Sequence, residues 1–305
     1  MPLVVELPYN PHFIQQYGTY KTHINALDRK KTAVQRQLAR GGLGSYEPEF
    51  QASLLALCEI TKDRLIFFDV GAHIGLYSAI VCAIFNDSNP YIVAFEPTPE
   101  TAKDAHILRD SNNLLYTILK KAVSDTYGFV DLHISDKAET SNSLNPDFRD
   151  GDTSVSVPLT TIDRAMEDGL MAPTVMKIDV ETFEAEVLQG SLKTIRTYQP
   201  FITLELLNGI DKTAIHSMLR AIECFGYKFY RVENERASWQ ANTADQAVDR
   251  ISSKYRDWIC VAGELGDDFY DAADRWRAAL IKCDKTTNVM VEAGTPIPDE
   301  LLGYY

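Results

Sequence analysis

The chain contains few cysteines, fewer basic than acidic residues, and no long hydrophobic run. Its five cysteines are widely separated and form no Cys-x-x-Cys pair, which favours buried thiols in a reducing, cytoplasmic compartment. The 30 lysines and arginines against 43 aspartates and glutamates give a formal net charge of −13, so the average surface would repel nucleic acid. The longest uncharged stretch, residues 70–86, is shorter than the ~20 apolar residues of a membrane span.

Apolar residues are abundant by contrast. They make up 45% of the 305 residues, enough for one large α/β domain with additions or for two small domains. Residues 1–60 are predicted to be a helical segment, with helices at 28–40 and 49–60, and no signal peptide is expected there. Residues 61–263 are predicted to form the main domain, and residues 264–305 a C-terminal extension that contains one amphipathic helix.

Within the main domain, short apolar runs alternate with segments of helix length. Near-continuous apolar runs are typical of parallel strands that are buried on both faces. The pattern therefore predicts a doubly wound, mostly parallel α/β sheet of seven strands. Ligands in such folds bind beyond the carboxyl ends of the strands. The predicted strands are residues 65–70, 91–95, 115–123, 175–180, 201–206, 228–232 and 258–262.

The first predicted strand ends in the motif Asp-Val-Gly-Ala-His-Ile-Gly at residues 69–75, and an apolar helix follows. Glycines let the backbone turn sharply and approach a ligand, and the helix N-terminus offers N–H donors. A nicotinamide fingerprint is excluded, because the third and sixth positions counted from Gly71 are His73 and Leu76 rather than glycine. The motif also lacks the Gly-Lys-Ser/Thr end of a P-loop. It is either the acid-x-Gly-x-x-x-Gly loop seen in methyltransferases or an ordinary turn between strand and helix.

The second predicted strand ends at Glu96 and Pro97, about 20 residues beyond the glycine loop. An acid at this spacing is placed to accept hydrogen bonds from ribose hydroxyls. Pro97 fixes its own φ and ends the strand. A solvated acid at a strand end is the alternative, and the glycine loop at this distance favours the ribose role.

Two later strands also deliver acids to the same edge. Strand 175–180 carries Lys177 and Asp179, with Glu181 directly after it, and alternation places all three on one side. Strand 201–206 carries Glu205 near its end. These residues are either structural ion pairs and solvated ends, or part of a ligand site. A rim of carboxylates suits a cationic sulfonium cofactor and would repel a dinucleotide phosphate.

Together these motifs resemble the FkbM family of S-adenosylmethionine-dependent methyltransferases. The resemblance implies a class I methyltransferase sheet, which is Rossmann-like, with S-adenosyl-L-methionine as cofactor. It also implies O-methylation of a hydroxyl on a sugar or natural product. His73 stands where the family commonly has Asn, and Thr182 stands where it commonly has Gly. The likeness covers roughly residues 60–262 and rests on residues 68–78, 94–97, 160–163, 177–181, 186–190 and 204–206.

The resemblance assigns roles to parts of the cofactor. The glycine loop would hold the methionine part, the strand-end acid the ribose, and the residues after the third strand the adenine. The cofactor-binding residues expected are Asp69, Gly71, Ala72, His73, Gly75, Glu96, Pro97, Ser124, Asp125 and Asp179.

A hydroxyl acceptor also needs a base that takes its proton. The catalytic candidates are Asp179, Glu181 and His73, and Asp179 leads because it ends the strand beside the cofactor strand. Two neighbouring carboxylates are too weak a pattern to predict a metal ion. The acceptor is expected to be a small molecule or a glycan, under the polar segments 135–156 and 233–257.

Other interpretations stay open at this point. A nucleotide-dependent oxidoreductase on a similar fold is one, and a non-catalytic binding or scaffold protein that keeps the fold is another. The N- and C-terminal additions offer contacts for a homo-oligomer. An N-terminal basic cluster is either a solvated helix face or a docking patch for an acidic partner. It consists of Arg29, Lys30, Lys31, Arg36 and Arg40.

Overall fold

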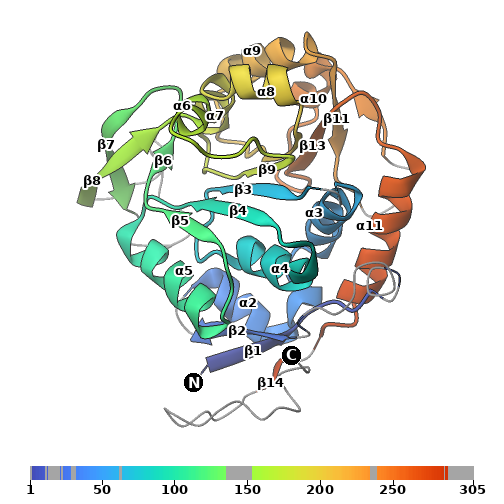
Figure 1. Cartoon of the computed structure of the whole chain (residues 1–305). Coiled ribbons are helices and arrows are strands. Elements are labelled where there is room, and N and C mark those ends of the chain that lie inside the picture. The colour runs from blue at the N-terminus through green and yellow to red at the C-terminus, as the bar shows by residue number, and fades with distance from the viewer. Residues whose placement is uncertain are drawn as a thin grey trace.

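A central sheet with helices on both of its faces dominates the architecture of the chain (Figure 1). Eight strands form this sheet in the computed structural model. The model describes residues 2–10, 12, 21, 23–28, 32–61, 64–134, 153–233, 239–284 and 286–287. In sheet order the strands are β12 (Ala241–Asn242), β11 (Tyr227–Arg231), β13 (Asp257–Ala262), β10 (Phe201–Glu205), β9 (Val175–Ile178), β3 (Ile66–Val70), β4 (Tyr91–Phe95) and β5 (Thr117–Leu119).

The sheet is mostly parallel, as the apolar runs predict. β10, β9, β3, β4 and β5 are joined by parallel pairings, whereas β13 pairs antiparallel with both β10 and β11. Seven strands are predicted from the sequence, and the eighth is the two-residue β12, which adds to the edge beside β11. Its two residues are too few to leave a periodic signal.

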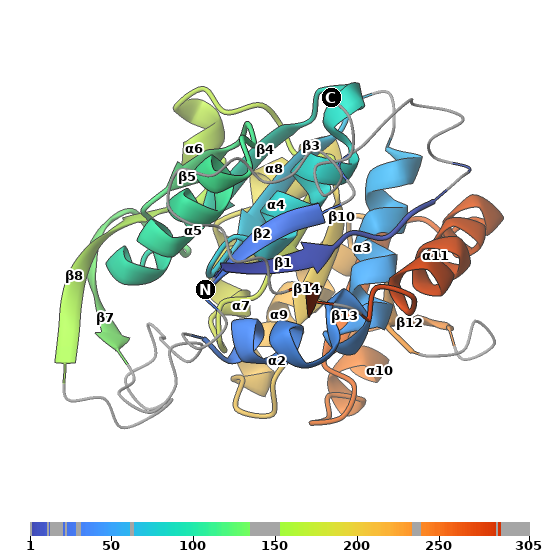
Figure 2. The ribbon, with the colours of Figure 1, turned by 90° about the horizontal axis from the view of Figure 1, so that it is seen from below.

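One predicted strand, residues 115–123, is divided in the structure. Its first half is β5, and its second half is β6 (Ala122–Val123), which belongs to a different sheet. The break falls where Lys121 donates its backbone N–H back to the carbonyl of Leu119, with an N···O distance of 2.9 Å. β6 pairs with β8 (Thr153–Thr160), which pairs with β7 (Gly128–Ile134), and these two strands extend outward from the main sheet (Figure 2).

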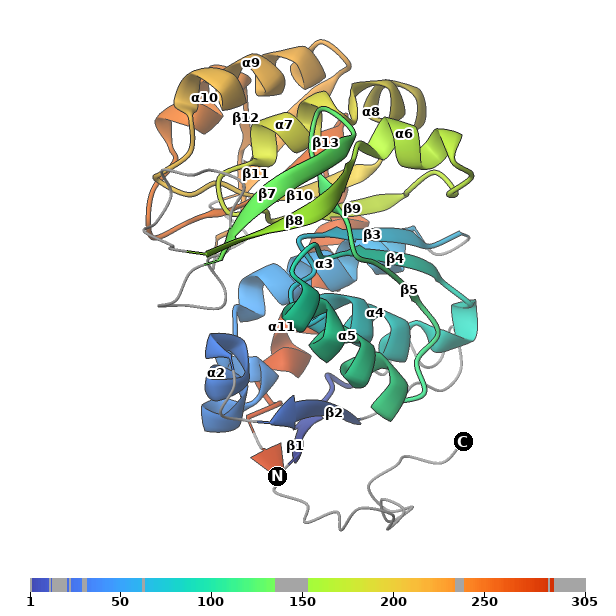
Figure 3. The same cartoon turned by 90° about the vertical axis from the view of Figure 1, so that its left-hand side faces the viewer.

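The helices divide between the two faces of the central sheet, which is the doubly wound arrangement (Figures 1 and 3). One face carries α3 (Pro48–Ile60), α4 (Leu76–Ile84), α5 (Pro99–Ser111) and α11 (Asp267–Leu280). The other carries α6 (Ile162–Glu167), α7 (Glu184–Gln189), α8 (Leu192–Tyr198), α9 (Lys212–Glu223) and α10 (Ala244–Asp249). No helix in the described ranges is long and apolar enough to cross a bilayer.

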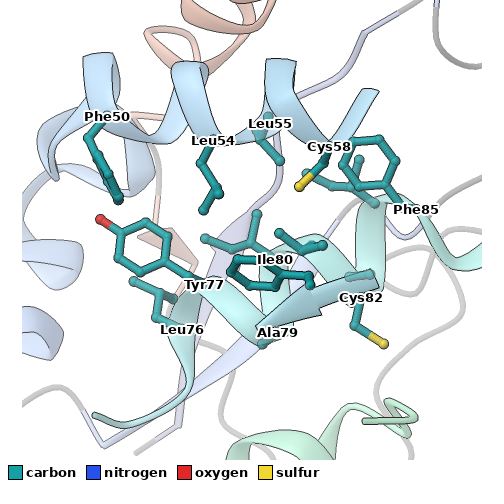
Figure 4. Packing of buried hydrophobic residues seen from close by; sticks show 14 of the residues in the cluster. Phe50, Leu54, Leu55, Cys58, Leu76, Tyr77, Ala79, Ile80, Cys82 and Phe85 are labelled. Atoms are coloured by element: carbon teal, nitrogen blue, oxygen red, sulfur yellow. The ribbon is translucent and has the colours of Figure 1, made fainter. Parts of the chain in front are cut away.

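Helix α3 is the central element of the first face. Phe50, Leu54 and Cys58 meet the apolar surface of α4, and the rings of Phe50 and Tyr77 lie 5.2 Å apart at 86° (Figure 4). On the side of α11, the buried carboxylate of Glu59 accepts a hydrogen bond from the indole N–H of Trp276 at 2.7 Å. A helix covered on both sides must be apolar nearly all round, which explains its composition.

The N-terminal segment contains two strands that the sequence patterns do not predict. They are β1 (Pro2–Glu6) and β2 (His23–Asp28), and β1 also pairs with β14 (Thr286–Thr287) from the far end of the chain. The predicted helix at 28–40 is α2 (Ala33–Gly41), which begins with a Thr32 capping box. Short 3-10 turns occur at η1 (Leu43–Ser45) and η2 (Asn86–Ser88).

The topology fixes where a ligand can bind. From β3 the chain moves outward through β4 to β5, and then returns to place β9 and β10 on the opposite side of β3. The strand order therefore reverses between β3 and β9. In open α/β sheets the crevice at such a switch point, beyond the carboxyl ends of the strands, is where ligands bind.

Candidate functional site

A cavity of about 310 Å³ lies at this edge of the sheet. It is lined by residues at the ends of four parallel strands and by residues of the N-terminal segment. Of the residues predicted for the site, it contains Gly71, His73, Glu96, Pro97, Asp179 and Glu181. The predicted residues outside its lining are Asp69, Ala72, Gly75, Ser124 and Asp125.

The glycine loop forms the floor between β4 and β9. Gly71 and Ala72 both donate their backbone N–H to the carbonyl of Phe95, with N···O distances of 3.0 Å. Gly71 has a φ of +77°, and a Cβ there would lie 1.8 Å from the carbonyl oxygen of Asp179. Only glycine permits both this left-handed conformation and this close approach. The loop is therefore held rigidly against the end of β9.

Asp69 supports this loop from inside the protein. Its carboxylate is fully buried, and one oxygen accepts hydrogen bonds from the backbone N–H and the hydroxyl of Ser78, at 3.2 and 2.7 Å. The other oxygen lies 3.5 Å from the Nζ of Lys177. Asp69 thus links β3 to the first turn of α4 and to β9. These contacts fit an indirect role in ligand binding.

Glu96 and His73 share one wall of the cavity. The Glu96 carboxylate accepts hydrogen bonds from the backbone N–H groups of His73 and Thr98, both at 2.8 Å. Burial raises the pKa of Glu96 to about 7, despite these hydrogen bonds. Burial likewise lowers the pKa of His73 to about 4, so its ring is neutral near pH 7. The Nε2 of His73 is buried and has no hydrogen-bond partner among the described residues.

The buried Lys177 stabilises the opposite wall through contacts with residues that line it. Its ammonium group lies 3.1 Å from a carboxylate oxygen of Asp179 and 3.3 Å from the carbonyl oxygen of Gly71. It also lies 5.4 Å from the ring centroid of Tyr77. Burial by itself would lower the pKa of Lys177, but the charges of Asp179 and Asp69 outweigh it and raise that pKa. Lys177 is therefore a permanent cation that joins β3, β9 and the glycine loop.

A second cation, Arg256, forms ion pairs with two other acids that line the cavity. Its guanidinium lies 3.0 Å from Glu205 and 3.0 Å from Glu47. Glu47 precedes α3 and also accepts a hydrogen bond from the hydroxyl of Tyr77 at 2.7 Å. These contacts join three parts of the chain at one rim of the cavity: β10, the segment before β13 and the N-terminal segment.

The loop after β9 adopts an unusual backbone conformation. Glu181 and Thr182 have φ values of +54° and +79°, in the left-handed region that favours glycine. The loop is held by the buried carboxylate of Glu184, which accepts hydrogen bonds from the N–H groups of Val180 and Thr182 at 3.1 and 3.2 Å. This geometry gives a physical reason for a glycine at the position of Thr182. Strain of this kind is common where a loop shapes a ligand site.

The strain at Thr182 can be measured. We expect Thr182→Gly to be more stable than Thr182→Ala by about 1 kcal/mol, because only glycine relieves a left-handed conformation. At Thr194, buried in α8, the order should be reversed, with Ala more stable than Gly by about 1 kcal/mol. Urea unfolding of the four variants measures both differences. Equal stability of the two Thr182 variants would show that the loop is unstrained.

Comparison with known proteins identifies the family. The sequence model described as "Methyltransferase FkbM domain" matches residues 69–229, which is more than half of the chain. The chain belongs to the FkbM methyltransferase family. The match begins at Asp69 of the glycine loop and includes β4, β9 and β10, so it covers most of the cavity wall.

Individual proteins are similar to this chain only at low sequence identity. A hexuronic acid methyltransferase, AglP of Haloferax volcanii, is 26% identical over 166 residues, which cover 53% of this chain and 64% of that protein. This is less than two thirds of the relative's own length. A solved FkbM methyltransferase from Methylobacillus flagellatus has 14% identity and a TM-score of 0.38, covering 65% of this chain and 44% of that one. A solved S-adenosylmethionine-dependent O-methyltransferase from Thermotoga maritima has 11% identity and a TM-score of 0.39, covering 71% and 66%.

Within this FkbM family member, the residues expected at the adenine lie beside the cavity. Ser124 is buried, donates its backbone N–H to the carbonyl of Thr160 at 2.9 Å, and packs against Gly190. A Cβ at Gly190 would lie 2.0 Å from the carbonyl oxygen of Ser124. The residues directly before Ser124 line the cavity in its place, together with Leu132 of β7. They are Lys121, Ala122 and Val123.

The N-terminal segment also contributes to the cavity, which no sequence motif indicates. Helix α2 supplies Ala33, Val34 and Gln37, and the turn before α3 supplies Tyr46 and Glu47. These residues reach the cavity by tertiary packing, and their local sequence carries no ligand-binding pattern. Among the described residues, no group of three or more His, Cys, Asp or Glu side chains is arranged to hold a metal ion.

Some predicted features fall outside the described residues. They are Arg29, Lys30 and Lys31 of the basic cluster, residues 135–152 and 234–238 of the two polar segments, and residues 288–305 of the C-terminal extension.

Proposed function

We propose that this chain binds S-adenosylmethionine in the cavity and transfers its methyl group to a hydroxyl of a sugar or natural-product acceptor. The observation that supports this proposal most strongly is a single cavity at the switch point. It brings together Gly71, Glu96 and Asp179, from the ends of three adjacent parallel strands. Membership of the FkbM methyltransferase family supports the same reaction class. The similarity to a protein named for hexuronic acid supports a sugar acceptor.

The chemistry of the cavity wall fits the cofactor. Among the residues that the structure describes, five carboxyl side chains line the cavity against two cationic ones, which favours a ligand with positive charge. The Nε2 of His73 has no partner among the described residues and can form a hydrogen bond with a ligand. The remaining lone pairs of Glu96 can accept hydrogen bonds from ligand hydroxyl or amino groups. The acidic residues are Glu47, Glu96, Asp179, Glu181 and Glu205, and the cationic ones are Lys121 and Arg256.

When bound, the cofactor supplies a methyl group on a sulfonium leaving group. The residues of this chain then have two tasks. They must align the acceptor, which can contribute several kcal/mol to lowering the barrier. They must also take a proton from the hydroxyl. We assign this task to Asp179, because its side chain lines the cavity and the neighbouring Lys177 keeps it ionised and able to accept a proton. Glu181 and His73 line the same cavity and are the alternatives.

The acidic rim also bears on the class of acceptor. Asp179 and Glu181 would repel a carboxylate as the methyl-accepting group, whereas a neutral hydroxyl can donate a hydrogen bond to them. To test this, the protein is incubated with cofactor carrying a labelled methyl group and with fractions of cell extract. We expect a labelled product that survives mild alkali, as a methyl ether does. A product that loses its label in alkali would be a methyl ester and would contradict a hydroxyl acceptor.

The role of Glu96 can be tested separately from turnover. Glu96→Ala removes an acceptor of charge-assisted hydrogen bonds, so we expect affinity for S-adenosylhomocysteine to fall about 10- to 100-fold. Because burial raises the pKa of Glu96 to about 7, wild-type affinity should weaken as the pH falls through 7, and the variant should lack this dependence. Calorimetric titration measures both effects. Glu100→Ala, at an exposed glutamate of α5 outside the cavity, is the control, and equal affinity of both variants would exclude the role.

A further inference from the structure

Asp179 and Glu205 come together because their strands are parallel neighbours. Leu204 of β10 pairs with Ile178 of β9, so the next residue of each strand is Glu205 on one side and Asp179 on the other. Both line the cavity, and because the two strands are in register, their side chains project side by side from the same face of the sheet, where they can exchange a hydrogen bond. Ionised carboxylates only accept hydrogen bonds, so a bond between two carboxyl groups requires a proton on one of them.

The surroundings determine which of the two holds the proton. Lys177 lies 3.1 Å from Asp179, whereas Glu205 shares Arg256 with Glu47. Burial followed by the charge of Asp179 raises the pKa of Glu205 far above its usual value. Burial alone would also raise the pKa of Asp179, but the charge of Lys177 outweighs it and holds that pKa below its usual value.

Charge balance supports the same assignment. Asp69, Asp179, Glu205 and Glu47 surround the two cations Lys177 and Arg256, and Asp257 of β13 also acts on Glu205. Five ionised acids around two cations would leave a net negative charge in a partly buried cluster, where the side chains of Glu205 and Asp179 are 11% and 35% exposed, and this is unfavourable. A proton on one acid relieves this charge, and Glu205 is the acid beside Asp179 that is placed to donate to it. The buried Nε2 of His73, which lines the same cavity and has no partner in the described part of the chain, independently supports a ligand site there.

We propose that Asp179 and Glu205 share one proton as a pair, and that Glu205 is a positioning residue that donates to Asp179 and aims its free lone pairs at the acceptor hydroxyl. The proposal rests on the proposed function. In the step it serves, the acceptor oxygen bonds to the methyl carbon, the carbon–sulfur bond breaks with its electron pair left on sulfur, and the acceptor proton moves to Asp179. Glu205 stays protonated throughout.

The proposal makes an asymmetric prediction for two conservative variants. Glu205→Leu, which cannot donate a hydrogen bond, should lower kcat at least about tenfold, and Glu205→Gln, which keeps a neutral donor of similar size, should restore kcat to within about threefold of wild type. Asp179→Asn removes the proton acceptor, and kcat should fall at least about 100-fold. Glu100→Gln, at an exposed glutamate of α5 outside the cavity, is the control for the loss of one acid. A fall of at least about 100-fold in Glu205→Gln would overturn the proposal, since it would mean that Glu205 acts in its ionised form.

A second readout does not depend on turnover. The infrared spectrum of the wild-type protein at pH 7 should contain the C=O band of a protonated carboxyl that Glu205→Gln abolishes and Glu181→Gln retains. A spectrum unchanged by Glu205→Gln would overturn the shared proton. If the band is present but the wild type methylates no hydroxyl acceptor, the pair stands and the proposed function fails. If hydroxyl methylation occurs without the band, the proposed function stands and the pair fails.

Discussion

Asp179→Asn is expected to lower kcat by about 10²- to 10⁴-fold, the usual contribution of a positioned base. Asn keeps the size of the side chain but cannot take a proton at the oxygen that faces the acceptor. Cofactor affinity should change less than about threefold, because most of the expected cofactor contacts come from the glycine loop and Glu96. Single-turnover kinetics with labelled cofactor separate the two quantities.

The control for this variant is Glu181→Gln, which changes an acid two residues away that lines the same cavity. It should retain kcat within about tenfold if Asp179 is the base. Circular dichroism should show the same spectrum and a cooperative transition for both variants, which confirms folding. Full activity of Asp179→Asn would remove this residue from the mechanism, and a complete loss in Glu181→Gln alone would transfer the role to Glu181.

Lys177→Met is expected to destabilise the fold by about 3–5 kcal/mol, the usual effect of removing one partner of a buried ion pair. Lys177 and Asp69 are 2% and 0% exposed, with their charged atoms 3.5 Å apart, so solvent screens this pair little. Methionine fills a similar volume, and the loss therefore reports charge rather than packing. Urea denaturation at pH 7 gives the free energy of unfolding.

An exposed pair of the same kind provides the control. Lys193 lies 3.1 Å from Glu167, but their side chains are 68% and 52% exposed. Lys193→Met should change stability by less than about 0.5 kcal/mol, because water screens the pair. A loss below about 1 kcal/mol in Lys177→Met would contradict the view that this lysine holds the glycine loop and β9 together.

The parallel core of the fold could be predicted because its signal is local. The runs that become β3, β4, β9 and β10 are apolar on both faces, and the helices between them keep their own periodicity. The small sheet of β1, β2 and β14 could not be predicted in this way. β1 pairs with β14 across nearly the whole length of the chain, and pairing at such a distance leaves no periodic mark in the sequence.

In the candidate site, too, some residues could be predicted from the sequence and others could not. Acids at strand ends are visible in the sequence, and parallel neighbours bring them to one edge, as with Asp179 and Glu205. The sequence does not predict Arg256 or Glu47 as site residues, because each lies outside any motif and reaches the cavity only through packing. The position of Thr182 is intermediate. Its departure from the family pattern can be read in the sequence, but the left-handed backbone that makes it a strained position requires the structure.

The central claim is that the cavity beyond β3, β4 and β9 is a site for S-adenosylmethionine. Calorimetric titration of the wild-type chain with S-adenosylhomocysteine, alongside the same titration with NAD, tests it most directly. We predict that S-adenosylhomocysteine binds at one site per chain, and that NAD, whose phosphates meet an acidic cavity without a nicotinamide-type glycine loop, does not bind. Binding of NAD in the absence of any binding of S-adenosylhomocysteine would contradict the claim.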